Sequence, residues 1–229
     1  MAHLKKAIDD AVSAIRGLAD LEEPFDRAVK MVLDCLLAGN KLLICGNGGS
    51  ASDATHLATE FLCRFQGDRR SYPAISLTTN GELITAISND YSFEEIFARQ
   101  IQGLAQKGDV LIAFTTSGKS KNVSRALEEA GAQGIQSVCF LGRDGGFTKG
   151  LATIDLLVQG SSTARIQEAQ KLLYHVLCSA RAKNSSFSAK VRSPGWALSM
   201  GAKPFRTDFS SPSTSPPMSF AISAVVNGI

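Results

Sequence analysis

Short apolar segments alternate with helical segments along residues 41–182, and this alternation constrains the fold more than any other feature of the chain. Short, wholly apolar strands that are separated by helices indicate a parallel sheet covered on both faces. Because the crossovers between parallel strands are right-handed, the helices pack as layers on either side of the sheet. The sequence therefore predicts an α/β fold, a three-layer αβα sandwich around a five-stranded parallel sheet.

The elements can be placed along the chain from apolar runs and helical periodicity. The predicted strands are residues 41–45, 74–78, 109–115, 137–142 and 153–159. The predicted helices that alternate with them are residues 50–65, 93–104, 122–132 and 162–182, with a short helical turn after residues 143–146. Two N-terminal helices come first, over residues 2–21 and 25–37, and Pro24 suits the first turn of the second.

The composition changes after about residue 182. Residues 183–229 are rich in serine, contain five of the seven prolines and have one acid, Asp208. Their apolar residues keep no period, so we expect a low-complexity tail without a stable fold. The junction falls inside a helical pattern, which leaves two origins open: a disordered extension, or a non-native peptide from a frame change in the source gene. The predicted domains are residues 1–182 and the tail, residues 183–229.

The net charge of +3 belongs to the tail. Residues 1–178 contain 18 basic and 20 acidic side chains, whereas residues 179–229 contain six and one. The domain therefore gives little reason to expect a nucleic-acid partner. No apolar run approaches the roughly 18 residues of a membrane span, and the N-terminal segment lacks the apolar centre of a signal peptide. We expect a cytoplasmic protein without a membrane partner, whose five scattered cysteines are reduced core thiols.

Two loops rich in glycine and hydroxyl groups follow predicted strands, where open parallel sheets bind ligands. The first, residues 46–50, reads Gly-Asn-Gly-Gly-Ser, and Ser50 can cap the next helix. The second, residues 115–120, reads Thr-Thr-Ser-Gly-Lys-Ser and offers four hydroxyls at a helix N-terminus, which suits a phosphate. It lacks the spacing of a nucleotide triphosphate loop. Each loop alone is compatible with a plain turn or helix cap, but together they favour a phosphate site.

Side chains on two predicted helices are candidates for proton transfer or metal binding. His56 and Glu60 are four residues apart and share a helix face, although such pairs are more often simple surface pairs. His175 lies among leucines and valine on the last helix, so a packed core histidine is the alternative. Gln167 is eight residues earlier, about 12 Å along the axis, which argues mildly against one metal shared by both.

Together these segments resemble the phosphoheptose isomerases, a family built on the flavodoxin-like sugar isomerase (SIS) domain. The resemblance covers about residues 30–178 and is carried by CGNGGSASDATHLATEF, AISND, FARQ, GDVLIAFTTSGKS, GRDGG, TARIQEA and HVLC. It implies an aldose–ketose isomerase that converts sedoheptulose 7-phosphate to D-glycero-D-manno-heptose 7-phosphate. That reaction would supply heptose precursors for lipopolysaccharide or another surface polysaccharide.

The resemblance also implies a role for each matching residue. Glu60 and His175 match the base and the acid of the proton transfer, and one zinc ion per subunit would be held by His56, Glu60, Gln167 and His175. Members are usually homotetramers with active sites between subunits. The residues that match substrate contacts are Asn47, Gly48, Gly49, Ser50, Glu60, Asn89, Asp90, Thr115, Thr116, Ser117, Ser120 and Gln167.

Three positions depart from the family pattern, and two other functions stay open. Lys119 stands where asparagine is common, Thr115 where serine is common, and Gln170 where histidine is frequent. None of them removes an acid, a base or a ligand. One alternative is a non-catalytic SIS protein that binds sugar phosphates or associates with a replication initiator. The other is an isomerase of a different sugar phosphate, or an N-acetyl-sugar-phosphate etherase. His175 favours the enzyme, because the initiator-associated relative lacks that histidine.

Overall fold

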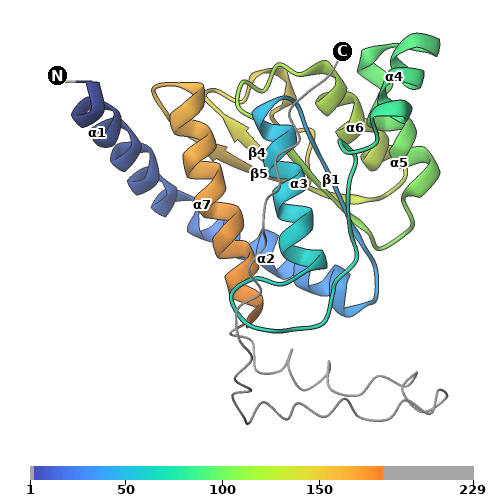
Figure 1. The fold of residues 1–229 in the computed structure, drawn as a ribbon, viewed down its shortest axis with the longest axis horizontal. Helices are drawn as coiled ribbons and strands as arrows, with labels where there is room; N and C mark the ends of the chain where they lie inside the picture. The colour runs from blue at the N-terminus through green and yellow to red at the C-terminus, as the bar shows by residue number, and fades with distance from the viewer. Residues whose placement is uncertain (1–2, 183–229) are drawn as a thin grey trace, which may run out of the picture. The chain divides into compact units, whose positions relative to one another are not determined.

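The computed structural model describes residues 3–182, and its centre is one sheet of parallel strands (Figure 1). Within that range five strands pair in the order β2-β1-β3-β4-β5, which confirms the predicted sheet. The strands are β1 Leu42–Gly46, β2 Ala74–Ser76, β3 Val110–Thr115, β4 Gln136–Gly142 and β5 Ile154–Val158. The predicted tail, residues 183–229, lies outside the described residues, so the domain boundary stays a prediction.

Helices cover both faces of the sheet and complete the predicted three layers. The α-helices are α1 His3–Arg16, α2 Glu22–Leu37, α3 Gly49–Leu62, α4 Gly81–Asp90, α5 Ala98–Leu104, α6 Lys121–Ala132 and α7 Thr163–Ala182. Helices α2, α3 and α7 pack on one face, and α5 and α6 pack on the other. Three short 3-10 helices in the same range are η1 Gly17–Leu21, η2 Phe93–Glu95 and η3 Gly146–Thr148. Across the described residues, no helix combines the length and the apolarity that crossing a membrane requires.

The central strands are mostly apolar because both of their faces are buried. Along β1, Leu42 and Ile44 join the core under α2, α3 and α7, while Leu43 and Cys45 join the core under α5 and α6. Each fully buried side chain of this size contributes roughly 1.5–3 kcal/mol, so the two clusters supply most of the stability of the sheet. Burial also raises the pKa of the Cys45 thiol to about 12, which keeps it protonated and inert.

Three predictions about local structure were wrong. The first helix does not run from residue 2 to residue 21, because α1 ends at Arg16 and a 3-10 turn follows from Gly17, a poor helix former. The helix predicted over residues 93–104 is broken, and only Ala98–Leu104 is α-helical, since Ile96 and Phe97 both enter the core before it. Cys63 is exposed, unlike the other four cysteines, because it lies just past the end of α3.

Helix α4 was not predicted at all. Only Ile87 of this helix is buried, so its apolar residues show too weak a period to stand out in the sequence. Its start is fixed locally, because the side chain of Asn80 accepts a hydrogen bond from the backbone N–H of Leu83 at 3.0 Å. This cap holds the helix in place with little help from the core.

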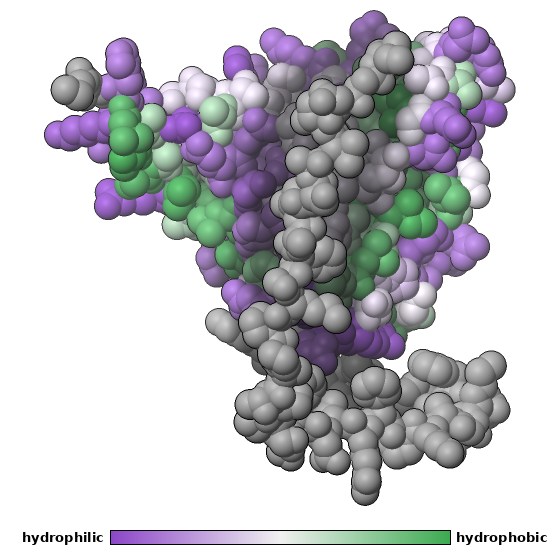
Figure 2. All heavy atoms as spheres, viewed as in Figure 1, coloured by the Kyte–Doolittle hydropathy of each residue, from purple (hydrophilic) through white to green (hydrophobic). Residues whose placement is uncertain are grey.

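Helix α1 carries an apolar stripe that the described residues leave exposed. The stripe consists of Leu4, Ile8, Val12 and Ile15, whose exposed fractions run from 74% to 39%. Figure 2 shows hydrophobic surface along this helix, which lies against α7 in Figure 1. A stripe at this spacing is the kind of helix face that usually packs against another helix.

Candidate active site

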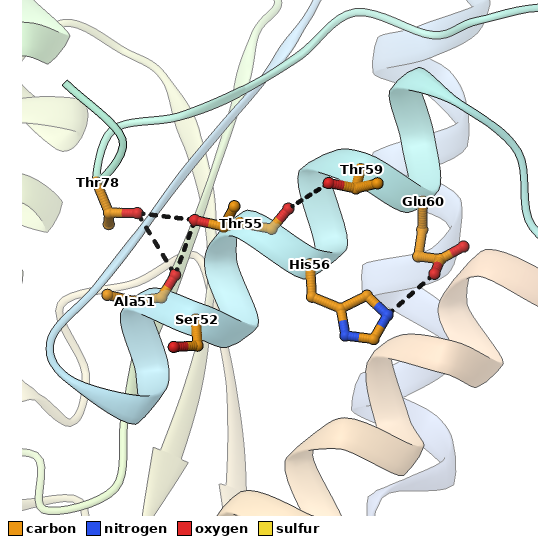
Figure 3. A pocket seen from close by; sticks show the side chains of 7 residues that line it. All are labelled: Ala51, Ser52, Thr55, His56, Thr59, Glu60 and Thr78. Atoms are coloured by element: carbon orange, nitrogen blue, oxygen red, sulfur yellow. Dashed lines mark hydrogen bonds and ion pairs between the residues drawn. The ribbon is translucent and has the colours of Figure 1, made fainter. Parts of the chain in front are cut away.

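A groove with a volume of about 630 Å³ runs along α3 (Figure 3). Thr55 and Thr78, which line the groove away from His56 and Glu60 (Figure 3), belong to a cluster of hydroxyl groups, in which Thr55 Oγ1 lies 3.2 Å from Ser76 Oγ and 3.1 Å from Thr78 Oγ1. Hydroxyls that both donate and accept suit a ligand that carries many hydroxyls of its own. The residues that line the groove are Ala51, Ser52, Thr55, His56, Thr59, Glu60 and Thr78.

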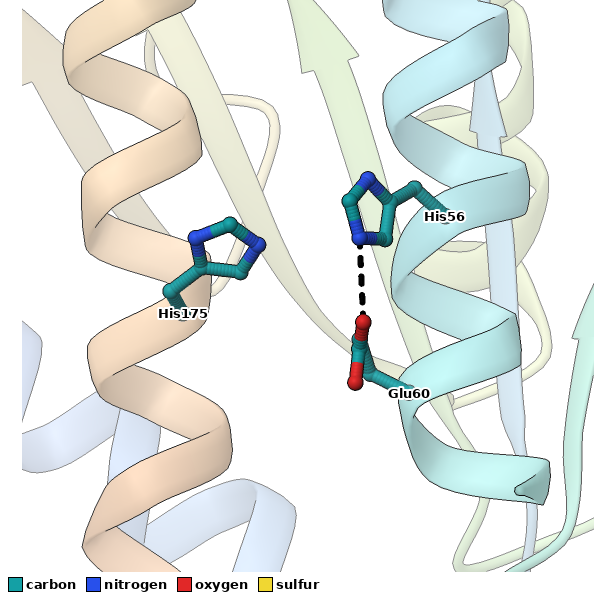
Figure 4. A group of neighbouring side chains, drawn as sticks. All are labelled: His56, Glu60 and His175. Carbon is teal, nitrogen blue, oxygen red and sulfur yellow. Dashed lines mark hydrogen bonds and ion pairs between the residues drawn. The ribbon is translucent and has the colours of Figure 1, made fainter. Parts of the chain in front are cut away.

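Two residues that line the groove, His56 and Glu60, meet a third side chain with which they can share a proton or a metal ion. His56 Nε2 and Glu60 Oε1 on α3 are 3.0 Å apart, and His175 reaches toward them from α7 (Figure 4). One nitrogen or oxygen atom from each of the three lies within 4.8 Å of the others. The shared helix face of His56 and Glu60 is as predicted, and the packing of α7 beside α3 brings the third group to it.

His175 is held in a partly buried setting that favours its neutral form. Its ring stacks on Phe65, with 5.6 Å between the centroids, and its pKa is lowered mainly by burial and further by the charges of His56 and Lys171. The carboxylate of Glu60 opposes this shift only in part. A neutral imidazole can bind a metal ion through one nitrogen and donate a hydrogen bond through the other. His175 is therefore partly exposed, and the alternative of a packed core histidine, which its leucine neighbours in the sequence had left open, does not apply.

A buried polar network lies behind the histidines, and sequence reasoning missed it. The hydroxyl of Tyr174 lies 3.3 Å from Asp53 Oδ1 and 3.3 Å from His56 Nδ1, and Lys171 Nζ lies 3.2 Å from the same carboxylate oxygen. Burial and the charge of Asp53 raise the pKa of Tyr174, so its hydroxyl stays protonated. One signal was available in the sequence, because Asp53 precedes His56 by three residues and so shares its helix face.

The donor set at this end of the groove fits a zinc ion. Two imidazole nitrogens and a carboxylate oxygen form the three-ligand arrangement of catalytic zinc sites, in which a fourth position stays open. Gln167, the other predicted ligand, lies elsewhere in this chain. Its amide packs so tightly against Gly49 that a side chain on Gly49 would collide with it. The folded chain thus brings together three of the four predicted ligands and places Gln167 at the first glycine-rich loop.

The second predicted loop, residues 115–120, lies at the N-terminus of α6. Thr115 is buried, and its Oγ1 accepts a hydrogen bond from the N–H of Gly118 at 3.1 Å. The hydroxyls of Thr116, Ser117 and Ser120 are partly exposed. In the described part of the chain, Ser120 caps no amide of α6 with its side chain, so the first turn of the helix keeps N–H groups for a ligand.

The two loops meet because β1 and β3 are neighbours in the sheet. The first loop is joined to the start of α6 by a reciprocal amide pair: Asn47 Nδ2 donates to Asn122 Oδ1 at 2.8 Å, and Asn122 Nδ2 donates to Asn47 Oδ1 at 2.9 Å. Asn122 was not predicted, since nothing in the sequence distinguishes it from a surface residue at a helix start. Ser50 does not cap α3 as predicted, because the helix already begins at Gly49 and Ser50 is buried in its first turn.

Asn89 and Asp90, two further predicted substrate contacts, lie outside the groove. They end α4, are exposed, and make a hydrogen bond from Asn89 Nδ2 to Asp90 Oδ1 at 2.9 Å. Asp90 instead borders a separate apolar hollow of about 400 Å³ between α4 and α5. Within one chain these two residues therefore stand apart from His56, Glu60 and His175.

Comparisons with known proteins agree with this architecture. The SIS domain family matches residues 6–142. The chain is 51% identical over 147 residues to a phosphoheptose isomerase of a Nitratiruptor species, covering 64% of this chain and 79% of that protein. The phosphoheptose isomerase from Francisella tularensis superposes with a TM-score of 0.74 at 34% identity, over 77% of this chain and 95% of that one. The one from Neisseria gonorrhoeae gives 0.71 at 36% identity, over 78% and 96%.

Proposed function

The chain belongs to the phosphoheptose isomerase family of SIS-domain enzymes, and we propose that it converts sedoheptulose 7-phosphate to D-glycero-D-manno-heptose 7-phosphate. The observation that carries this proposal is the meeting of His56 and Glu60, which line a groove with several hydroxyls, with His175 of α7. The product would enter heptose synthesis for a surface polysaccharide, and we expect the enzyme to work in the cytoplasm.

The reaction moves a proton between adjacent carbons, and Glu60 is the proposed base. Its Oε1 faces His56, so proton transfer falls to the second oxygen of the carboxylate. The side chain is only 18% exposed, which limits the competition of water for the carboxylate oxygens. Glu60 would take the proton from one carbon of the open-chain sugar and return it to the neighbouring carbon.

His175 is the proposed acid, and the loop at residues 115–120 is the proposed phosphate site. A neutral imidazole near the reacting carbons would donate a hydrogen bond to the carbonyl oxygen as negative charge builds on it. The hydroxyls of Ser117 and Ser120 and the N-terminus of α6 would bind the phosphate. Binding at this remote end supplies energy that positions the reacting end of the sugar.

We propose that His56, Glu60 and His175 hold one zinc ion, which would stabilise negative charge on the substrate oxygens when bound. Gln167 would complete the ligands only after its amide leaves Gly49, and it is the weakest member of the predicted set. Metal analysis of protein purified without chelator tests the ion. Metal-free protein with full activity in a strong chelator would leave the three residues as acid, base and hydrogen-bond partners alone.

We further propose that the enzyme is a homotetramer with active sites between subunits. The exposed stripe of α1, from Leu4 to Ile15, offers an apolar surface that a second copy would cover. Asn89 and Asp90 lie outside the groove of their own chain, so an interface is the simplest way for them to meet a substrate. The partners proposed for this protein are therefore a sugar phosphate and further copies of the chain.

An isomerisation assay on a panel of sugar phosphates tests the function. We expect turnover of the seven-carbon ketose phosphate, and losses of about 10²- to 10⁴-fold in Glu60→Gln and in His175→Ala. Glu128→Gln, at an exposed position of α6, is the matched control and should keep full activity. Circular dichroism should show that all variants fold. Tight binding of the sugar phosphate without turnover would support a sensor instead, and turnover of a different sugar phosphate would correct the substrate.

A further inference from the structure

A chain of polar contacts runs from the protein interior to His56. Asp53 is 4% exposed and Tyr174 is fully buried, and the tyrosine hydroxyl lies 3.3 Å from Asp53 Oδ1. On its other side the same hydroxyl lies 3.3 Å from His56 Nδ1, and the two rings meet edge to face with 5.7 Å between centroids. The opposite nitrogen of the imidazole, Nε2, lies 3.0 Å from Glu60 Oε1. One buried carboxylate is thus linked to the groove through two rings.

The hydrogen atoms in this chain of contacts can be assigned from its buried end. An ionised carboxylate only accepts hydrogen bonds, and a tyrosine has a single O–H to give. Lys171 Nζ, 3.2 Å from Asp53 Oδ1, is a second donor that faces the same oxygen. Tyr174 therefore donates to Asp53, and its oxygen is left to accept a hydrogen bond from His56, which must then carry its proton on Nδ1.

The reverse arrangement, in which Tyr174 donates to His56, places two hydrogen-bond acceptors against each other. If Tyr174 donated to His56 Nδ1, its oxygen would face the oxygen of the buried Asp53 at 3.3 Å with no hydrogen between them. Two acceptors in contact inside a protein repel each other, and Asp53 Oδ1 would keep only Lys171 Nζ as a donor. His56 is 39% exposed and faces the groove, so solvent, a proton or a metal ion can satisfy its outer nitrogen more easily.

We propose that Asp53 and Tyr174 are positioning residues that fix the tautomer of His56 and so prepare its Nε2 to bind a divalent cation beside Glu60. A neutral imidazole with its proton on Nδ1 points the lone pair of Nε2 at the oxygen of Glu60, and that contact is favourable only with a cation between them. The proposal rests on the metal site of the proposed function, but the tautomer itself can be measured without metal and without substrate.

The decisive measurement is the ¹⁵N spectrum of the histidine rings in metal-free protein at a pH where they are neutral. The chain has three histidines, so a His3→Gln background leaves His56 and His175 to assign. We expect His56 with its proton on Nδ1, and we expect Tyr174→Phe to lose that preference while keeping the ring in place. Zinc or cobalt affinity should fall about 10- to 100-fold in Tyr174→Phe, as for other residues that orient metal ligands.

Tyr91→Phe, at an exposed tyrosine between α4 and η2, is the matched control and should keep the metal affinity of the unaltered chain. A proton on Nε2 of His56 in the unaltered chain would overturn the proposal, whether or not Tyr174→Phe folds. Equal metal affinity in Tyr174→Phe and the unaltered chain would overturn it as well. A protein that shows the Nδ1 proton but binds no metal would support the fixed tautomer and refute the metal site of the proposed function.

Discussion

Asp155 on β5 shows what burial does to an acid that lies away from the groove. Its Oδ2 accepts a hydrogen bond from the N–H of Gly150 at 2.7 Å, while Oδ1 is buried and lacks a hydrogen-bond partner among the described residues. Loss of solvent raises the pKa of this carboxyl above its ordinary value, and Lys149 offsets the shift only in part. The ionised form is therefore less stable in the folded protein than in the unfolded chain.

We expect Asp155→Asn to stabilise the protein at neutral pH. Because the folded pKa is raised, the folded state binds the proton more tightly, and stability falls as pH rises from the unfolded value through the folded one. Asparagine keeps an oxygen for Gly150 and carries no charge. Urea unfolding should show a higher midpoint for Asp155→Asn at pH 7 and a smaller difference near pH 4. Asp68→Asn, at an exposed site, should change neither, and a lower midpoint for Asp155→Asn at pH 7 would contradict the expectation.

Single residues were predictable where a local spacing decides their neighbours. The four-residue step from His56 to Glu60 fixes a contact within one helix turn, and the structure has it at 3.0 Å. The approach of His175 depends on how α7 packs beside α3, which no local pattern encodes, and only the family resemblance suggested it. The roles of Tyr174 and Asn122 were not predicted for the same reason, since each acquires its polar partner through tertiary structure.

At the scale of elements, the loop at residues 115–120 is shaped by its contact with the segment that contains Gly145 and Thr148. Gly118 has a φ of +62° and lies directly against the backbone of Gly145, where a side chain would collide. Thr148 holds the contact, because its N–H and its hydroxyl donate to the Gly118 carbonyl at 3.1 and 2.8 Å. The hydroxyls of the loop are therefore positioned before any ligand arrives.

This geometry predicts the effect of removing two hydroxyls from the loop. Ser117→Ala combined with Ser120→Ala should weaken binding of inorganic phosphate and of the sugar phosphate alike, since each neutral hydrogen bond contributes about 0.5–1.5 kcal/mol. Isothermal titration with both ligands measures the loss. Ser161→Ala, at an exposed serine before α7, serves as the control. Unchanged affinity of the double variant for both ligands would place the phosphate elsewhere.

Elements with strong apolar patterns were predictable, and weakly buried ones were not. All five strands occur where apolar runs predicted them, although β2 is shorter than expected, ending at Ser76. Helix α4 was missed because it buries one residue, and η2 interrupts a predicted helix because core packing there outweighs helical periodicity. A strand that is buried on both faces has a continuous apolar run in its sequence, whereas an exposed helix with a good cap has no comparable pattern.

For the whole molecule, the exposed stripe of α1 is the feature most open to test. Ile8→Lys with Val12→Lys would place two charges on this surface, and a buried interface does not accept unpaired charges. We expect the double variant to have a lower mass than the unaltered chain in analytical ultracentrifugation. Ser13→Lys, at an exposed polar position on the same helix, should assemble normally. Assembly of Ile8→Lys with Val12→Lys at full mass would exclude this stripe from the interface.

The tail supplies the last prediction at this scale. From the composition of residues 183–229 we expect no core of their own, so truncation after Lys183 should preserve solubility, assembly and activity. Light scattering and the isomerisation assay measure these properties. A truncated chain that unfolds or dissociates would show that the tail packs on the domain, and would count against its origin in a frame change.

The class and topology of the domain followed from the sequence, because a parallel sheet with two buried faces has few alternatives. The positions of the functional groups around the sheet were predicted from the sequence less completely. Adjacent strands bring the two loops together as predicted for an open sheet, whereas Asn89 and Asp90 end far from the groove in one chain. If Asn89 and Asp90 meet the substrate across the proposed interface, the pattern of a single sheet would not encode it.

The reciprocal amide pair of Asn47 and Asn122 has a consequence for how such sequences evolve. Each side chain both gives and receives a hydrogen bond, and the two positions are 75 residues apart. Replacing one asparagine alone strands the other amide in a largely buried place, at a cost of roughly 1–3 kcal/mol. A replacement at one position should therefore be more destabilising while the other asparagine is still present than after it has been replaced. A mutational scan should therefore find strong epistasis in stability between the two positions that join the first glycine-rich loop to α6.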